Sequence, residues 1–91
     1  MAMESLEYKE LLHGFGKDLK RTDEDLYEAT DGDVEPGQRQ AAIAAGRRKL
    51  QEYDAMLARF DDGERAHAAE RFGERIGDIR RSLQQLGERL P

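Results

Sequence analysis

The last third of the chain carries the repeat that most constrains the fold. Apolar or small residues recur there at alternating spacings of three and four, at Ala69, Phe72, Ile76, Ile79, Leu83, Leu86 and Leu90. Such spacing places side chains in a narrow stripe along one face of a helix. An apolar stripe is unfavourable in water, so the helix predicted over residues 64–90 needs other helices to cover it.

The two preceding segments carry stripes of the same period and are the expected partners. The first, predicted to be helical over residues 5–28 with Ser5 as N-cap, has the stripe Tyr8, Leu12, Phe15, Leu19, Thr22 and Leu26. The second, predicted over residues 36–61, has the stripe Ile43, Gly46, Leu50, Tyr53, Leu57 and Phe60, with Met56 on its flank. Thr22 to Asp25 also reads as a second helix start, but the stripe keeps its phase there, which favours one helix.

Two connections join these helices. Residues 30–37 concentrate turn formers and include Pro36, which suits the first turn of a helix. Asp61-Asp62-Gly63 supplies a stop and a cap within three residues, so the second and third helices should form a tight antiparallel hairpin. Three helices of similar length predict an all-α fold, an up-down-up antiparallel three-helix bundle that occupies residues 1–91 as a single domain.

Charge and composition bound the function. The chain is 38% charged with a net charge of −5, and residues 1–35 hold eleven acidic residues against four basic ones. There is no cysteine, no apolar run of the roughly 20 residues that span a bilayer, and no signal-peptide pattern at residues 1–4, so a cytoplasmic location is expected. The basic triplet Arg47-Arg48-Lys49 has no aromatic neighbour to stack a base, so no nucleic-acid binding is expected.

Two motifs have partial metal-binding character. Glu10-x-x-His13 puts a carboxylate and an imidazole on one helix face, but a di-iron site needs two such motifs and two further glutamates, and His67-x-x-Glu70 runs in reverse order. A metal-dependent oxidoreductase formed by self-association would require these four residues to converge. We expect no metal and no cofactor.

Residues 31–35 resemble the opening of a calcium loop. Pro36 occupies the place of the turn glycine, however, and Ala42 stands where a bidentate glutamate is required. An acidic, solvated linker is therefore the expected state.

Residues suited to nucleophilic catalysis are scarce. The only serines are Ser5 and Ser82, and neither lies in a strained turn. Carboxylates on the third helix are expected to form ion pairs along it, Glu70 and Glu74 with Arg71 and Arg75. The sequence therefore predicts a non-catalytic protein whose polar faces contact other proteins; it identifies neither the binding face nor the oligomeric state.

Residues 39–61 resemble the second helix of the vesicle-transport v-SNARE N-terminal domain, a family of Qb-type SNAREs. The matching positions are Leu50, Glu52, Met56-Leu57 and Phe60-Asp61. The third helix is similar at Arg65, Phe72, Ile76, Ile79, Leu83 and Leu86, and the first at Leu6-Glu7-Tyr8, Phe15 and Asp18-Leu19. The chain departs from the family in its short link at residues 61–63 and in having Phe60 where the family has methionine.

The resemblance implies a three-helix regulatory domain of vesicle transport and membrane trafficking. Such a domain binds adaptor, tether or SNARE-related proteins and influences SNARE assembly without catalysis, on the cytosolic face of Golgi or endosomal membranes. Its SNARE motif and membrane anchor would follow Pro91. The Ala-, Arg-, Glu- and Gly-rich composition fits a small bacterial helical interaction protein equally well, such as a secretion-associated chaperone or inhibitor.

Overall fold

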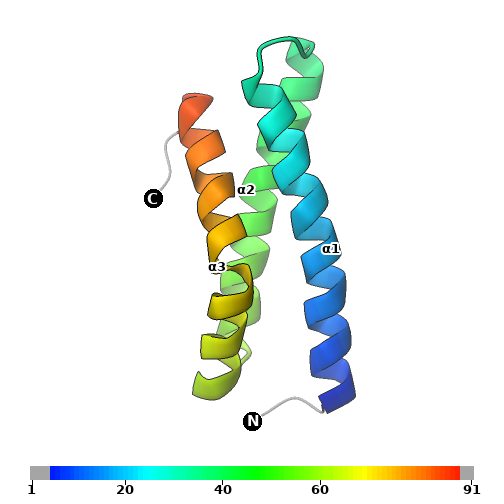
Figure 1. Ribbon diagram of the computed structural model, residues 1–91, viewed down its shortest axis with the longest axis vertical. Coiled ribbons are helices and arrows are strands. Elements are labelled where there is room, and N and C mark those ends of the chain that lie inside the picture. Colours follow the sequence, from blue (N-terminus) through cyan, green and yellow to red (C-terminus); the bar gives the residue numbers. More distant parts are fainter. Residues whose placement is uncertain (1–4, 89–91) are drawn as a thin grey trace.

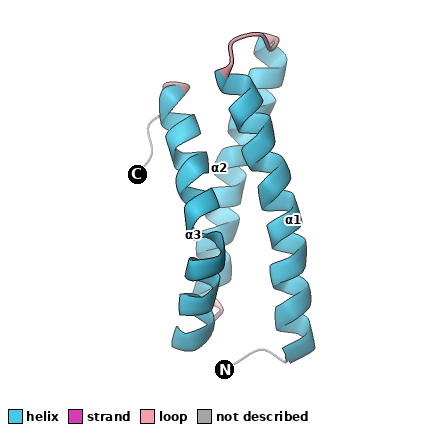
Figure 2. Ribbon diagram, viewed as in Figure 1, coloured by secondary structure: helices cyan, strands magenta, loops and turns pink. Residues whose placement is uncertain are grey.

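The computed structural model describes residues 5–88, which form three helices. These are α1 (Ser5–Thr30), α2 (Pro36–Ala58) and α3 (Asp62–Gln85). In Figure 1, α1 and α3 run in the same direction, and α2 lies behind them in the opposite direction. Figure 2 shows helices and connecting loops and no strand in the described part of the chain. The predicted all-α three-helix bundle is thereby confirmed.

The helix ends differ from the predicted ones for identifiable reasons. α1 is already helical at Ser5, so this serine is not its N-cap, and it continues two residues beyond the predicted end at residue 28. α3 ends at Gln85, before the predicted residue 90, because Gly87 adopts a φ of +86°. The backbone N–H of Gly87 donates to Gln84 O and that of Glu88 to Leu83 O, both at 3.0 Å, which is a Schellman ending.

The α2–α3 turn is set by a capping box that the sequence contains. α2 ends at Ala58, and Asp61 is the N-cap of α3. The Glu64 N–H donates to Asp61 Oδ1 at 2.8 Å, and the Asp61 N–H donates to Glu64 Oε1 at 3.0 Å. These two bonds satisfy otherwise unpaired donors at the helix start. They begin α3 at Asp62, two residues before the predicted start, within the predicted tight hairpin.

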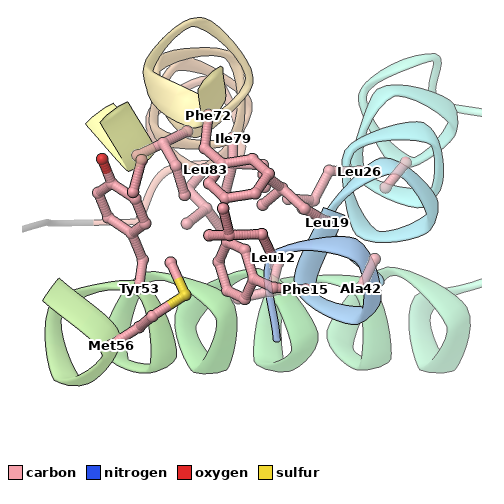
Figure 3. Close-up of a cluster of buried hydrophobic side chains, with 14 of the residues drawn as sticks. Leu12, Phe15, Leu19, Leu26, Ala42, Tyr53, Met56, Phe72, Ile79 and Leu83 are labelled. Carbon is pink, nitrogen blue, oxygen red and sulfur yellow. The ribbon is translucent and has the colours of Figure 1, made fainter. Parts of the chain in front are cut away.

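The core forms along the predicted stripe of α1. Leu12, Phe15, Leu19, Thr22 and Leu26 are buried, Tyr8 is half-buried, and Ala29 extends the stripe by one turn. Figure 3 shows the labelled α1 side chains meeting Phe72, Ile79 and Leu83 of α3 beside Tyr53 and Met56 of α2; the α1 side chains are Leu12, Phe15, Leu19 and Leu26. The Phe15 ring packs edge-on against Phe72 with centroids 5.1 Å apart, a favourable arrangement of two aromatic quadrupoles.

Two stripe assignments on the other helices were wrong. Ala68, and not Ala69, is buried on α3, since Phe72 is preceded on the core face by the residue four positions earlier. On α2, Met56, predicted on the flank of the stripe, is buried, whereas Leu57 is half-buried and packs against the edge of the core. Leu90 lies outside the described residues.

At Gly46, α2 lies in close contact with both other helices. A Cβ atom at this position would lie 2.7 Å from Leu26 Cδ1 and 3.3 Å from Leu83 Cδ2. The missing side chain therefore lets α2 approach both other helices closely. Gly14, in contrast, faces open space.

Candidate interaction groove

A groove follows the line where α1 and α3 lie side by side. Three depressions of about 300, 230 and 650 Å³ succeed one another along it, and each is lined by side chains from both helices. The lining residues of α1 recur at helical spacing from His13 to Thr30, and those of α3 from Arg71 to Gln85. We call this surface the α1–α3 groove.

The half of the groove nearer the start of α1 is basic. Its depression is rimmed by Lys17, Lys20, Arg71 and Arg75, which we call the basic half. The floor is apolar, formed by Gly16, Leu19 and Phe72. The Arg71 guanidinium lies 5.4 Å from the centre of the Phe72 ring, within the range of a cation–π contact.

The other half of the groove is acidic. It is lined by Asp23, Glu24, Glu28 and Asp78, which we call the acidic half, together with Arg81. Arg81 is hydrogen-bonded to Asp78, and Arg75 reaches across from the basic half to Asp23 at 3.4 Å. Glu24 and Glu28 lie one helical turn apart, with no salt bridge to any other residue that the structure describes.

The pKa of Asp23 reflects the negative charge of the acidic half. Burial raises the pKa of its carboxyl group, the neighbouring Asp78 carboxylate raises it further, and Arg75 partly opposes the shift. The Asp23 side chain keeps 18% of its exposure, so it is partly shielded from water. An added cation on this half would stabilise the ionised form.

One large aromatic side chain stands on the lip of the acidic half. Tyr27 is 74% exposed, although it has the size and chemistry of a core residue. Tyrosine is enriched in protein interfaces because it buries a large apolar area and keeps a polar end. The groove can therefore supply both charge and an aromatic anchor.

The residues proposed from metal-site spacing lie on exposed helix faces. Glu10 and His13 are exposed on α1, and His67 and Glu70 are exposed on α3. The His67 ring packs 6.2 Å from the ring of Tyr8. Over residues 5–88, no group of three or more His, Cys, Asp or Glu residues is arranged to hold a metal ion.

The remaining sequence candidates take structural or solvated positions. Asp31 and Asp33 are exposed in the α1–α2 loop, where Gly32 turns the chain with a φ of +85°. Lys49 is not a free surface base, because its ammonium group lies 2.6 Å from Glu52 and 5.7 Å from the centre of the Phe15 ring. Arg75, expected to pair along α3, pairs with α1 instead.

Comparison of the chain with protein-family models, with curated proteins and with solved structures gives no match. No helix within residues 5–88 combines the length and the apolar character that crossing a membrane requires.

The groove is a feature that sequence reasoning missed. Its signal on α1 is a second stripe, Lys17, Lys20, Glu24 and Glu28, spaced by three and four like the core stripe and changing sign in the middle. The α3 positions could not be matched to it, because spacing alone does not say which neighbour a polar face adjoins.

Proposed function

We propose that this chain is a non-catalytic protein-interaction domain that uses the α1–α3 groove as its binding surface. The observation that carries the proposal is the groove itself, a continuous surface with charged rims and the exposed Tyr27 on its lip. Large exposed aromatic side chains beside a polar rim are typical of surfaces that bind other proteins. The long rod shape, 44 × 24 × 17 Å, gives the groove room along its axis.

The resemblance to the v-SNARE N-terminal domain extends this proposal. On that basis the domain regulates SNARE assembly in vesicle transport, with an adaptor, a tether or a SNARE-related protein as its partner, at the cytosolic face of Golgi or endosomal membranes. The support is the set of matching positions in the three helices, now seen in a bundle with the expected helix order. The natural reading frame tests this part. A heptad-repeat segment and a terminal apolar run of about 20 residues after Pro91 would support it, and a stop codon there would contradict it.

Photo-crosslinking tests the interaction function. A photoreactive phenylalanine analogue replaces Tyr27 in the groove or, as the matched control, Arg48 on the exposed face of α2. We expect a product heavier than the domain by the mass of a foreign protein at position 27 and not at position 48, and we expect excess unlabelled domain to suppress it. If neither position gives a crosslinked product that excess unlabelled domain suppresses, the interaction function is contradicted. A product at position 48 alone would contradict the assignment of the groove as the binding surface.

A further inference from the structure

The charge of the α1–α3 groove reverses at half its length. In the basic half, four basic side chains rim the depression. In the middle depression, Arg71 and Arg75 lie beside the carboxylates of Asp23, Glu74 and Asp78. In the acidic half, four carboxylates stand against the single base Arg81. A surface that contacts only water gains nothing when its positive and negative charges are separated in this way. Like charges placed one turn apart on a helix are even mildly unfavourable.

A surface with this polarity is complementary to itself. A two-fold axis that crosses the groove at its middle, perpendicular to the helices, places the groove of a second copy antiparallel to the first. Each basic half then faces an acidic half, and α1 faces α1 while α3 faces α3. Two-fold dimers are built from one patch that serves on both copies in this way.

We propose that the α1–α3 groove joins two copies of this chain in an antiparallel dimer, with the basic half of each copy against the acidic half of the other. The inference goes beyond the proposed function: a second copy and a foreign protein use the same groove, so pairing of two copies would compete with partner binding. The charge complementarity of the two halves selects a second copy as the occupant.

The register on α1 supports this arrangement. Residues at equal distances from the crossing point face each other, because a helix rises by a constant amount per residue. With the crossing point near Thr22, Lys20 of one copy faces Glu24 of the other, and Lys17 faces Glu28. Both contacts join opposite charges, and each occurs twice in the dimer.

The same register holds on α3. With the crossing point near Gly77, Arg75 faces Asp78 of the other copy and Glu74 faces Arg81, so these contacts also join opposite charges. The two crossing points lie at the same height along the bundle, because Asp23 lines the middle depression together with Glu74, Arg75 and Asp78. Two helices with unrelated sequences thus agree on one two-fold axis.

In this dimer the exposed Tyr27 side chain contacts the second copy. At the same register it faces Lys17 of the other copy, on the rim of the depression whose floor contains Gly16 and Phe72. A lysine beside a tyrosine ring gives a cation–π contact, and burial of the ring removes its exposed area from water. Because the contacts are largely charged and peripheral, the dimer should be weak and sensitive to salt.

A charge-swap experiment tests the proposal. The first variant, Lys17→Glu with Lys20→Glu, makes the α1 side of the groove acidic throughout, and the second, Glu24→Lys with Glu28→Lys, makes it basic throughout. The matched control, Glu7→Lys with Asp25→Lys, changes the charge of α1 by the same amount as the second variant, at exposed positions outside the groove. Sedimentation velocity measures the mass of each protein alone and of their mixtures against the monomer mass of 10.4 kDa.

We expect the wild-type domain and the control to dimerise at low salt, and about 0.5 M salt to weaken the dimer about tenfold or more. Each groove variant alone should be monomeric, since its own halves repel. An equimolar mixture of the two groove variants should form a heterodimer at least as stable as the wild-type dimer, whereas the first variant mixed with the control should not.

Three results would overturn the proposal. The first is a wild-type domain that stays monomeric at low salt. The second is a pair of groove variants that remain monomeric when mixed. The third is dimerisation that either groove variant leaves unchanged. None of these results touches the crosslinking of foreign proteins, so failure of the dimer and failure of the interaction function remain distinguishable.

Discussion

The two faces of α1 use the same helix for opposite purposes. On the core face, Leu19 and Leu26 have no exposure and Leu12 has 2%. On the groove face, Lys17, Lys20 and Glu24 stand in water at the same three-and-four spacing. The core face carries large apolar side chains, while the groove face carries charges whose sign changes along the helix. The side chains that pack the core and the charged side chains of the groove therefore occupy separate faces of one helix.

The largest expected effect comes from placing a charge on the core face. Ile76→Asp buries a carboxylate with no partner at a side chain that is 4% exposed, which costs several kcal/mol and exceeds what a small domain can lose. We expect loss of the cooperative thermal transition in circular dichroism. Gly73→Asp, at an exposed site one turn earlier on α3, is the control and should fold. An unchanged melting curve for Ile76→Asp would disprove the position of the core.

A smaller effect comes from adding volume at Gly46, where α2 lies close to both other helices. Gly46→Val inserts side-chain atoms against Leu26 and Leu83 and should destabilise the domain by about 1–3 kcal/mol in urea unfolding. Gly14→Ala fills open space and removes a flexible residue from the helix interior, so it should stabilise by about 0.5–1 kcal/mol. The opposite signs are the test: if both substitutions stabilise, α2 does not approach its neighbours as closely as described.

The capping box at the start of α3 should contribute about 1 kcal/mol. Asp61→Ala removes the acceptor of the Glu64 N–H and should lower the free energy of unfolding by roughly that amount. Asp62→Ala is the neighbouring control, since this side chain is fully exposed and its salt bridge to Arg65 is a surface one. Equal losses for the two variants would show that helix-end charge, and not the cap, is responsible.

The smallest effect is a dependence on pH at Asp23. Its pKa is raised on folding, so the protein binds this proton more tightly when folded, and the contribution to stability is lost as pH rises through the folded pKa. Asp23→Asn should therefore gain stability relative to the wild type as pH rises from about 3 to about 7. Urea unfolding at several pH values measures the difference. A relative loss with rising pH would mean that Arg75 outweighs both burial and Asp78.

The sequence predicted the core face of α1 well because large apolar residues mark almost every turn of it. On α3, Ala68 and Ala69 are equally small, so periodicity alone could not choose between them. On α2, the alanines at positions 41, 42, 44 and 45 make the apolar stripe harder to define. Phe60 could not fix the register of this stripe, because it packs on the core from beyond the helix end. The sequence does contain the signal for the capping box, because Asp61 is followed three residues later by Glu64.

The groove was harder to predict than the core. Burial leaves a strong pattern, since a core position must be apolar, but an exposed charge is compatible with any solvated face. Which polar side of α1 adjoins α3 depends on the handedness of the bundle, and helical spacing contains no information on handedness. The pairing of Asp23 with Arg75 across the two helices needed the structure.

The independence of the core from the charged groove face is tested most directly by thermal unfolding of the two groove variants, Lys17→Glu with Lys20→Glu and Glu24→Lys with Glu28→Lys, at a protein concentration where the wild type is monomeric. We predict that both melt cooperatively within about 4 °C of the wild type, because the four substituted side chains are exposed. A large fall in the melting temperature of either variant, with loss of helical signal, would show that the groove face holds the bundle together and would contradict the account.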